Sequence, residues 1–180
     1  MEATPLIVHL NLEKIRSKPF EIYSNQNIIL IISGIGNINI AIATTYLLST
    51  FQTAKSDKIY NIGICGSKST NNDIGELYTI KKIVNQSTNK VVHITNNSDT
   101  REESITTTPI AQNSSHKIKT NLVDMESFGF YSSAKLFLPK ESIMIIKIVS
   151  DKVDDTILGK NIIYSLLENK IEEIKSLMLL

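Results

Sequence analysis

Three short, almost uninterrupted apolar runs stand out along the chain. They lie at Asn27–Ser33, Ile59–Cys65 and Ile143–Val149, and isoleucine dominates each of them. Each run is too short for a typical helix and is typical of a strand buried on both faces of a mostly parallel sheet. A further strand is predicted at Leu77–Val84, where β-branched residues follow Gly75.

Between and after these runs the apolar positions change to helical spacing. The first such set comprises Ile40, Ala43, Leu47, Leu48 and Phe51, and the C-terminal set comprises Leu158, Ile162, Leu166, Ile171, Ile174 and Met178. Both sets predict amphipathic helices that pack on a sheet. Strands that alternate with helices favour an α/β layered fold, and 180 residues without a visible boundary predict a single domain over residues 1–180.

The stretch from Asn85 to Asn121 has a different character. Asn, Ser and Thr make up 18 of its 37 residues. Short strands are predicted at Val91–Thr95 and Ile105–Thr108, with loops between them.

Composition excludes several classes of function. The 19 basic and 18 acidic residues give a net charge of +1 without a basic stripe, so no nucleic-acid partner is expected. No apolar run approaches the roughly 18 residues of a membrane span, and Met1–Leu10 lacks the pattern of a secretory signal. The single cysteine, Cys65, cannot form an internal disulfide. A cytoplasmic protein is the expectation.

Asp151 directly follows one of the apolar strands. In open α/β sheets, ligands gather beyond the carboxyl ends of strands, and a carboxylic acid there can serve as a general acid. The alternative is structural, because Ser150 or Asp151 could cap a turn or a short helix.

A second group of chemical interest is Val123–Glu126, which precedes a helix with Phe130 on its apolar face. The carboxylate of Glu126 can accept hydrogen bonds from a vicinal diol such as that of ribose, and Met125 can pack on the sugar. A purely structural reading is also open, in which Glu126 interacts with the helix dipole and Met125 fills the core.

Two glycines and four other residues carry weaker signals. Gly34 and Gly36 follow a strand and precede a helix, which could leave N–H groups for an anion, but a lone GxG is a weak signal and tight turning is the favoured explanation for both glycines. Cys65 is interpreted as a core residue. The three histidines, His9, His93 and His116, have no metal-ligand spacing.

Four segments in order resemble the purine nucleoside phosphorylase and methylthioadenosine/S-adenosylhomocysteine nucleosidase family. They are SGIGNINIAIAT (Ser33–Thr44), NIGICGSKSTNNDIGELYTIKKIV (Asn61–Val84), LVDMESFGFY (Leu122–Tyr131) and IIKIVSDKVDD (Ile145–Asp155). The DME and VSD elements are the most specific. The resemblance implies a three-layer αβα fold with a mixed sheet flanked by helices.

The resemblance also implies site residues and their roles. Asp151 would protonate the purine, Glu126 would hold the ribose hydroxyls, and Glu2 would activate a water molecule. The other residues expected to contact the substrate are Met125, Ser150, Lys147, Gly66 and Phe128. No metal or organic cofactor is expected, and a homo-oligomer, dimer or hexamer, is implied.

The chain departs from the family pattern in three places. The family's first strand lies before the position of Glu2. Either the sheet of this chain lacks that strand and leaves unpaired backbone groups on its neighbours, or the sequence starts late. Ile64 replaces a serine, and Lys147 replaces an arginine. Lys147 interrupts an apolar strand and therefore needs a partner or a path to water.

Three functions remain open from the sequence. Hydrolysis is favoured over phosphorolysis, because Arg16 and Arg101 are the only arginines and neither falls in a matched phosphate-binding segment. A purine nucleoside is the expected small-molecule partner, and phosphate is a second partner in the phosphorylase alternative. The alternatives are a phosphorylase and a degenerate member of the family that binds nucleosides without cleaving them.

Overall fold

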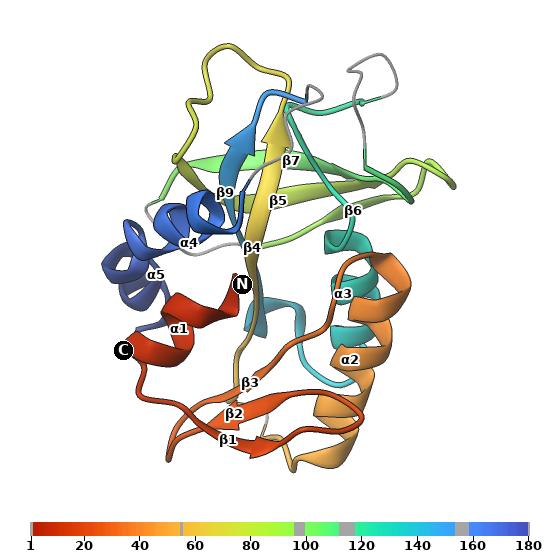
Figure 1. Ribbon diagram of the computed structural model, residues 1–180. Coiled ribbons are helices and arrows are strands. Elements are labelled where there is room, and N and C mark those ends of the chain that lie inside the picture. Colours follow the sequence, from red (N-terminus) through yellow and green to blue (C-terminus); the bar gives the residue numbers. More distant parts are fainter. Residues whose placement is uncertain (1, 55, 96–99, 112–117, 154–158, 180) are drawn as a thin grey trace.

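The computed structural model describes residues 2–54, 56–95, 100–111, 118–153 and 159–179 (Figure 1). Its helices are α1 (Ala3–His9), α2 (Asn37–Thr50), α3 (Ser127–Ala134), α4 (Lys160–Glu168) and α5 (Ile171–Met178), with a 3-10 turn η2 (Lys140–Ser142). Its strands are β1 (Glu13–Arg16), β2 (Ile22–Ser24), β3 (Ile29–Ile31), β4 (Ile59–Ser67), β5 (Leu77–Asn85), β6 (Val91–His93), β7 (Glu102–Thr107), β8 (Leu122–Asp124) and β9 (Ile143–Asp151).

A mixed six-stranded sheet forms the centre of the molecule. Its order is β6-β5-β7-β8-β4-β9, and β5 also pairs with β9, so that five of its strands pair in a closed cycle. The longest pairing is parallel and joins β4 to β9, from Ile59 opposite Ile143 to Gly66 opposite Asp151. This register aligns the carboxyl ends of the two longest apolar strands.

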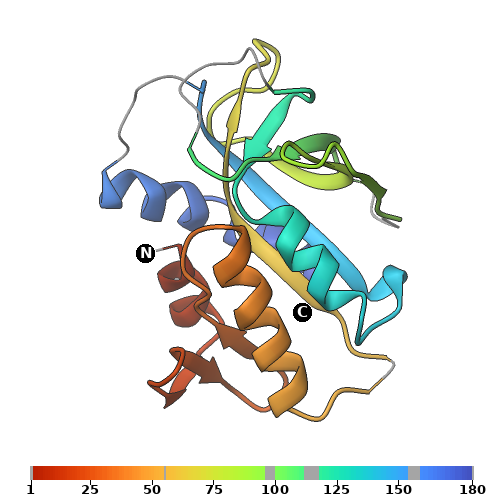
Figure 2. The same ribbon diagram turned by 90° about the vertical axis from the view of Figure 1, so that its right-hand side faces the viewer.

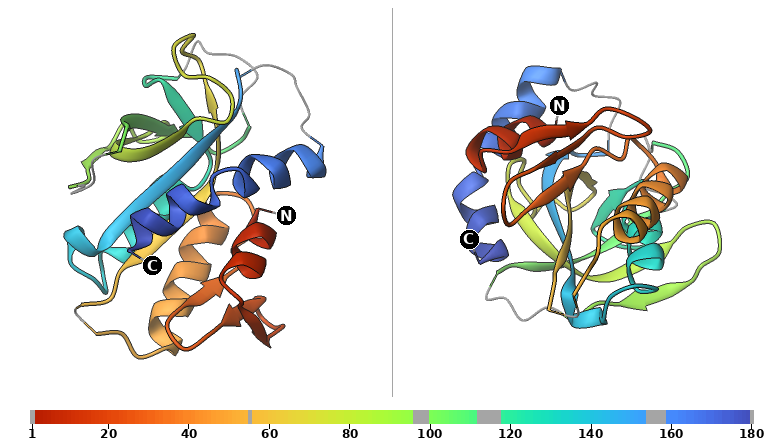
Figure 3. Two further views of the ribbon diagram at one scale, coloured as in Figure 1. Left: turned by 90° about the vertical axis from the view of Figure 1, so that its left-hand side faces the viewer. Right: turned by 90° about the horizontal axis from the view of Figure 1, so that it is seen from below.

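The continuous apolar runs of β4 and β9 are explained by helices on both faces of the sheet. Alternate side chains of a strand point to opposite faces. Ile59 and Ile145 join the core cluster under α2 and α3, whereas Ile62 and Ile146 join the cluster under α1, α4 and α5. Figure 2 shows α2 and α3 side by side on one face, and Figure 3 shows α1, α4 and α5 on the other. The predicted α/β layered fold is therefore confirmed.

The prediction for Asn27–Ser33 is partly wrong. A strand forms there, but it is antiparallel to β2 in a separate three-stranded sheet, β1-β2-β3. Ile29 keeps 40% of its surface exposed, and within the described residues β3 is paired on one side alone. The first described element is helix α1, and no described strand precedes it.

The remaining elements match their predictions with shifted ends. The helical spacing after Gly36 corresponds to α2, and β5, β6 and β7 occupy the three weaker strand predictions. The C-terminal helix is two helices, which are separated at Asn169 and Lys170. Leu158 lies outside the described residues. None of the described helices is both long and apolar enough to cross a membrane.

Candidate active site

The turn between β8 and α3 separates two neighbouring carboxylates into different roles. Asp124 ends β8 and is buried, and its Oδ2 accepts hydrogen bonds from Ser127 N–H at 2.9 Å and Ser127 Oγ at 2.6 Å. Thr107 Oγ1 donates to Asp124 Oδ1 at 2.9 Å. Asp124 therefore accepts the hydrogen bond from a free N–H group in the first turn of α3, and Glu126 makes no side-chain capping bond.

The carboxylate of Glu126 turns instead toward the glycine turn before α2. Gly36 N–H donates to Glu126 Oε1 at 2.7 Å, and Met125 N–H donates to Oε2 at 3.2 Å. Gly36 has φ of 100°, a conformation that is costly for residues with a Cβ. The tight turn is thus present, and it aims the Gly36 N–H at the Glu126 carboxylate of another element, so this N–H is not left for a bound anion.

Lys147 lies at the centre of a cluster of carboxylates. Its side chain is 2% exposed, and its Nζ lies 3.1 Å from Asp124 Oδ2 and 4.0 Å from Glu126 Oε2. Burial alone would lower the pKa of Lys147, but the charges of Asp124, Glu126 and Glu2 raise it. Lys147, which interrupts the apolar strand β9, is therefore a buried ammonium group with acidic partners.

Glu2 joins this cluster from the N-terminal side of α1. A Cβ built on Gly63 would lie 3.3 Å from Glu2 Oε2 and 3.4 Å from Lys147 Nζ, so both groups sit over the same residue of β4. Burial raises the pKa of Glu2, and Glu126 raises it further. Lys147 and the hydrogen bond from Ile64 N–H act in the opposite direction. A carboxylate with a raised pKa is better matched to general base catalysis near neutral pH.

Asp151 lies at the end of β9, where it forms a local turn and also faces a cavity. Val153 N–H donates to Asp151 Oδ1 at 2.9 Å, and Ser150 Oγ lies 2.7 Å from Oδ2 and 3.0 Å from the carbonyl oxygen of Cys65. The single hydroxyl proton of Ser150 can be donated to either acceptor. When Asp151 is protonated it can donate to Ser150, which then donates to Cys65, so Ser150 can serve both forms of the acid.

Gly66 leaves the space that the Asp151 carboxylate occupies. It pairs with Asp151 across the β4–β9 ladder. A Cβ on Gly66 would lie 2.8 Å from Asp151 Oδ1 and 3.2 Å from methyl groups of Val123 and Val153. Cys65 before it is buried, and burial raises the pKa of its thiol, in keeping with its interpretation as a core residue.

One cavity of about 980 Å³ connects these residues. Of the residues singled out from the sequence, it is lined by Glu2, Gly66, Met125, Glu126, Lys147, Ser150 and Asp151. Phe128 does not line it, because this residue packs from α3 against the core cluster, and Phe130 of the same helix lines the cavity instead. Within the described residues, no three His, Cys, Asp or Glu side chains gather as metal ligands.

Two residues of this site, Asp124 and Gly63, have no role in the predictions from the sequence. Asp124 is the first residue of the DME segment. The available signal was an acid at the end of one apolar strand together with a lysine inside another, and the two side chains face each other in the structure. Gly63 interrupts the run of β4 beneath Glu2 and Lys147. Its only signal in the sequence is the glycine itself.

Structural comparisons place the fold among nucleoside-processing proteins. A methylthioadenosine/S-adenosylhomocysteine nucleosidase from Helicobacter pylori, solved with butyl-thio-DADMe-Immucillin-A, aligns at a TM-score of 0.78 and 16% identity, with 98% of this chain and 93% of that chain covered. The Campylobacter jejuni nucleosidase of the same name aligns at 0.80 and 14% identity, over 98% and 93%. A futalosine hydrolase of H. pylori aligns at 0.78 and 16% identity, with 98% and 92% covered.

The similarity to these solved structures shows a shared fold, and the family is shown by a separate match of the sequence to a family model. The family model described as "Phosphorylase superfamily" matches residues 11–120, which is more than half of the chain. The chain therefore belongs to the phosphorylase superfamily. The matched range includes Gly36 and Gly66 and ends before the DME segment. No curated protein sequence matches the chain significantly.

Proposed function

We propose that residues 1–180 act as one domain that hydrolyses the N-glycosidic bond of a purine nucleoside. The observation that best supports this is the single cavity lined by Glu2, Glu126 and Asp151. These acids come from the start of α1, the β8–α3 turn and the end of β9. Three carboxyl groups in one cavity can serve as base, diol acceptor and acid, which are the roles that glycoside hydrolysis requires.

In the proposed reaction the bond between C1′ and N9 breaks, and its electron pair goes to the purine. Asp151 donates a proton to N7 of the base as this negative charge develops. Glu126 accepts hydrogen bonds from the ribose hydroxyls, and the sugar passes through an oxocarbenium-like state. Water adds its oxygen to C1′ and gives a proton to Glu2, so the products are the free base and ribose.

The remaining residues of the site have supporting roles in this proposal. Lys147 orients the Glu2 and Glu126 carboxylates, and its charge opposes the effect of burial on the pKa of Glu2. Met125 packs on the sugar. Ser150 holds Asp151 in both protonation states, and Gly66 gives the acid its space. Phe128 is left out, because it packs against the core cluster and does not line the cavity.

Hydrolysis is favoured over phosphorolysis by the surroundings of the arginines. Arg16 donates to Tyr46, Arg101 donates to Glu76, and neither arginine lines the cavity. Bidentate pairing with phosphate is therefore hard to build from this chain. The names of the similar structures, a nucleosidase and a hydrolase, support the same choice.

Product analysis separates the two reactions. Incubation with 5′-methylthioadenosine or adenosine, in buffer free of phosphate, is expected to release adenine and the free sugar. Adding inorganic phosphate should change neither the rate nor the products. Formation of a sugar 1-phosphate that depends on phosphate would overturn hydrolysis and favour the phosphorylase alternative.

A substitution of the acid separates an enzyme from a binding protein. Asp151→Asn should lower kcat/KM by about 10²- to 10⁴-fold while nucleoside binding is retained, because a positioned general acid contributes on this order. Asp73→Asn is the matched control, since this exposed acid does not line the cavity. If the wild-type protein binds adenosine and cleaves none, the non-catalytic alternative is correct.

A further inference from the structure

The face of β4 that carries part of the site also carries an amide, that of Asn61. Alternate side chains of a strand point to opposite faces. Ile59 and Cys65 belong to the core cluster under α2 and α3, whereas Ile62 joins the cluster under α1, α4 and α5. Asn61 and Gly63 stand between Ile59 and Cys65 in this alternation. Both residues therefore face α2 and α3.

The side chain of Asn61 is buried, yet one of its polar groups is unused. The residue is 7% exposed and lines the cavity of about 980 Å³ that holds the candidate acid and base. Its Nδ2 has no hydrogen-bond partner among the described residues. A buried donor without a partner costs about 1–3 kcal/mol, and in native structures such a group is explained by a catalytic role, a water molecule or an ion. The amide therefore points to a polar guest in the cavity.

The carboxylate of Glu2 lies over the next residue on the same face of the strand. A Cβ on Gly63 would lie 3.3 Å from Glu2 Oε2 and 3.4 Å from Lys147 Nζ. Residues i and i+2 of a strand are about 6.6 Å apart, and no hydrogen bond joins Asn61 Nδ2 to the Glu2 carboxylate. One water molecule with two hydrogen bonds spans up to about 6 Å. A water can therefore bridge the amide and the candidate base.

The neighbouring residues of β4 cannot take over this contact. Residues 62–65 of the strand carry neither an amide nor a hydroxyl side chain. The N–H of Ile64 is already used by the Glu2 carboxylate, and the Ile64 side chain belongs to the cluster on the opposite face. Across the sheet, Lys147 Nζ lies 3.1 Å from Asp124 Oδ2, which accepts one of its three N–H groups. Asn61 is thus the neutral donor that β4 offers beside Glu2.

We propose that Asn61 positions the water molecule that attacks C1′, an inference that rests on the proposed hydrolysis. The water donates one hydrogen to Glu2, and Asn61 Nδ2–H donates to one lone pair of the water, so the second lone pair is directed at C1′. As this oxygen bonds to C1′, its proton passes to Glu2, and the electron pair of the C1′–N9 bond leaves with the base. Asn61 transfers no proton and acts by orienting the water.

Replacing the amide with an apolar side chain of similar size tests this role. Asn61→Leu should lower kcat by about 10- to 100-fold, because a misplaced reactant costs on this order, while KM changes less than about threefold. The Tm should stay level or rise, since Nδ2 loses no partner among the described residues. A purely structural amide would give the reverse pattern, with a lower Tm and an unchanged kcat.

Asn72→Leu is the matched control. Asn72 is 4% exposed, and its Nδ2 also lacks a partner in the described part of the chain, but the residue does not line the cavity. The same substitution at this position should leave kcat and KM unchanged. An equal loss of kcat in the two variants would mean that a buried amide affects turnover through the fold, and the role of Asn61 would be overturned.

A high-resolution crystal structure of the wild type gives a readout that does not depend on turnover. It should show an ordered water within hydrogen-bond distance of both Asn61 Nδ2 and a Glu2 carboxylate oxygen, and Asn61→Leu should lose this water. If the wild type holds no such water, the inference is wrong whatever the activity. Loss of the water with an unchanged kcat would refute the positioning role and leave the proposed hydrolysis standing. A wild type that holds the water but cleaves no nucleoside would refute the hydrolysis, and with it the role in the attack.

Discussion

At the residue scale, the site is defined by the competition between burial and charge around Lys147. One ammonium lies among Asp124, Glu126 and Glu2. Burial is the main cause of the raised pKa of Glu2, and the charge of Glu126 raises it further, whereas the charge of Lys147 opposes both effects.

Replacing Lys147 tests the cluster as a structural unit. Lys147→Met should lower the free energy of unfolding by about 3–5 kcal/mol, because it leaves the buried Asp124 carboxylate without its partner. Urea unfolding monitored by circular dichroism measures the change. Lys81→Met is the control, since this lysine is exposed on β5, and should stay within about 0.5 kcal/mol of the wild type.

The raised pKa of Glu2 predicts opposite effects of pH on stability and activity. The folded protein keeps a proton that the unfolded chain releases near pH 4.5, so the Glu2 contribution to stability falls as pH rises from 4.5 through the raised value. Glu2→Gln removes this dependence. The free energy of unfolding of the wild type, minus that of the variant, should therefore decrease with pH over this window.

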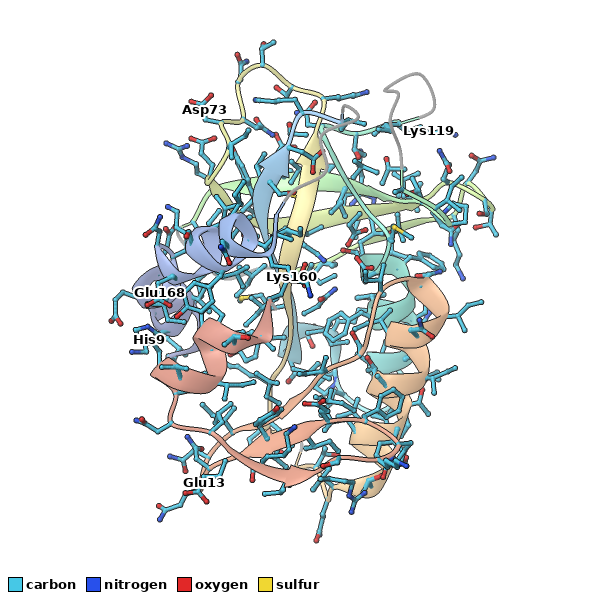
Figure 4. All side chains as sticks on the ribbon, in the orientation of Figure 1. His9, Glu13, Asp73, Lys119, Lys160 and Glu168 are labelled. Atoms are coloured by element: carbon cyan, nitrogen blue, oxygen red, sulfur yellow. The ribbon has the colours of Figure 1, made fainter. Side chains whose placement is uncertain are left out.

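Activity depends on the ionised form of the same side chain. The value of kcat/KM for nucleoside cleavage should fall on the acid side, below the raised pKa of Glu2, and Glu2→Gln should lower it about 10²-fold or more. Glu13→Gln, at an exposed position of β1, is the control (Figure 4). A wild-type activity in Glu2→Gln would exclude Glu2 as the base.

At the scale of elements, the close approach of β4 and β9 positions the acid. Gly66→Ala places a Cβ 2.8 Å from Asp151 Oδ1, so the carboxylate must move. We expect a loss of about 1–3 kcal/mol in unfolding free energy and a fall in kcat/KM of more than tenfold. Gly159→Ala is the control, because a Cβ there meets no atom within 4 Å. Unchanged kcat/KM in Gly66→Ala would contradict the proposed role of the strand ends.

At the scale of the whole molecule, two core clusters hold the sheet from opposite faces. The cluster under α1, α4 and α5 also fixes the entry of Glu2 into the site, since Leu6 and Leu10 of α1 belong to it. His9 of α1 and Glu168 of α4 are joined by a hydrogen bond of 2.8 Å at the edge of this cluster (Figure 4). The position of the candidate base therefore depends on the packing of the chain's two ends.

A core truncation tests this dependence. Ile174→Ala, at a fully buried position of α5, should lower the unfolding free energy by about 2–5 kcal/mol. It should also speed amide exchange in α1. Ile42→Ala on the exposed face of α2 should change both quantities little. Unfolding in urea and exchange detected by mass spectrometry provide the two readouts.

Local sequence signals determined most elements of the fold and supplied the candidate residues of the site. The isoleucine-rich runs predicted β4 and β9, because only strands covered on both faces are apolar at every position. The DME and VSD segments identified Glu126 and Asp151 as candidates. The small sheet could not be found in this way, because its three strands are short and their pairing depends on contacts with the rest of the molecule.

The tertiary structure alone decided which of these candidates share a cavity. Three parts of the site lie far apart in the chain: Glu2, the DME segment with Asp124 and Glu126, and Lys147. No local sequence pattern predicts the distances between their side chains. The structure brought Gly36 to Glu126, separated the cap Asp124 from the free carboxylate Glu126, and turned Phe128 into the core. Hydrophobic periodicity specifies the face that a residue occupies, whereas electrostatic partners are set by the pairing of strands, which is a property of the assembled sheet.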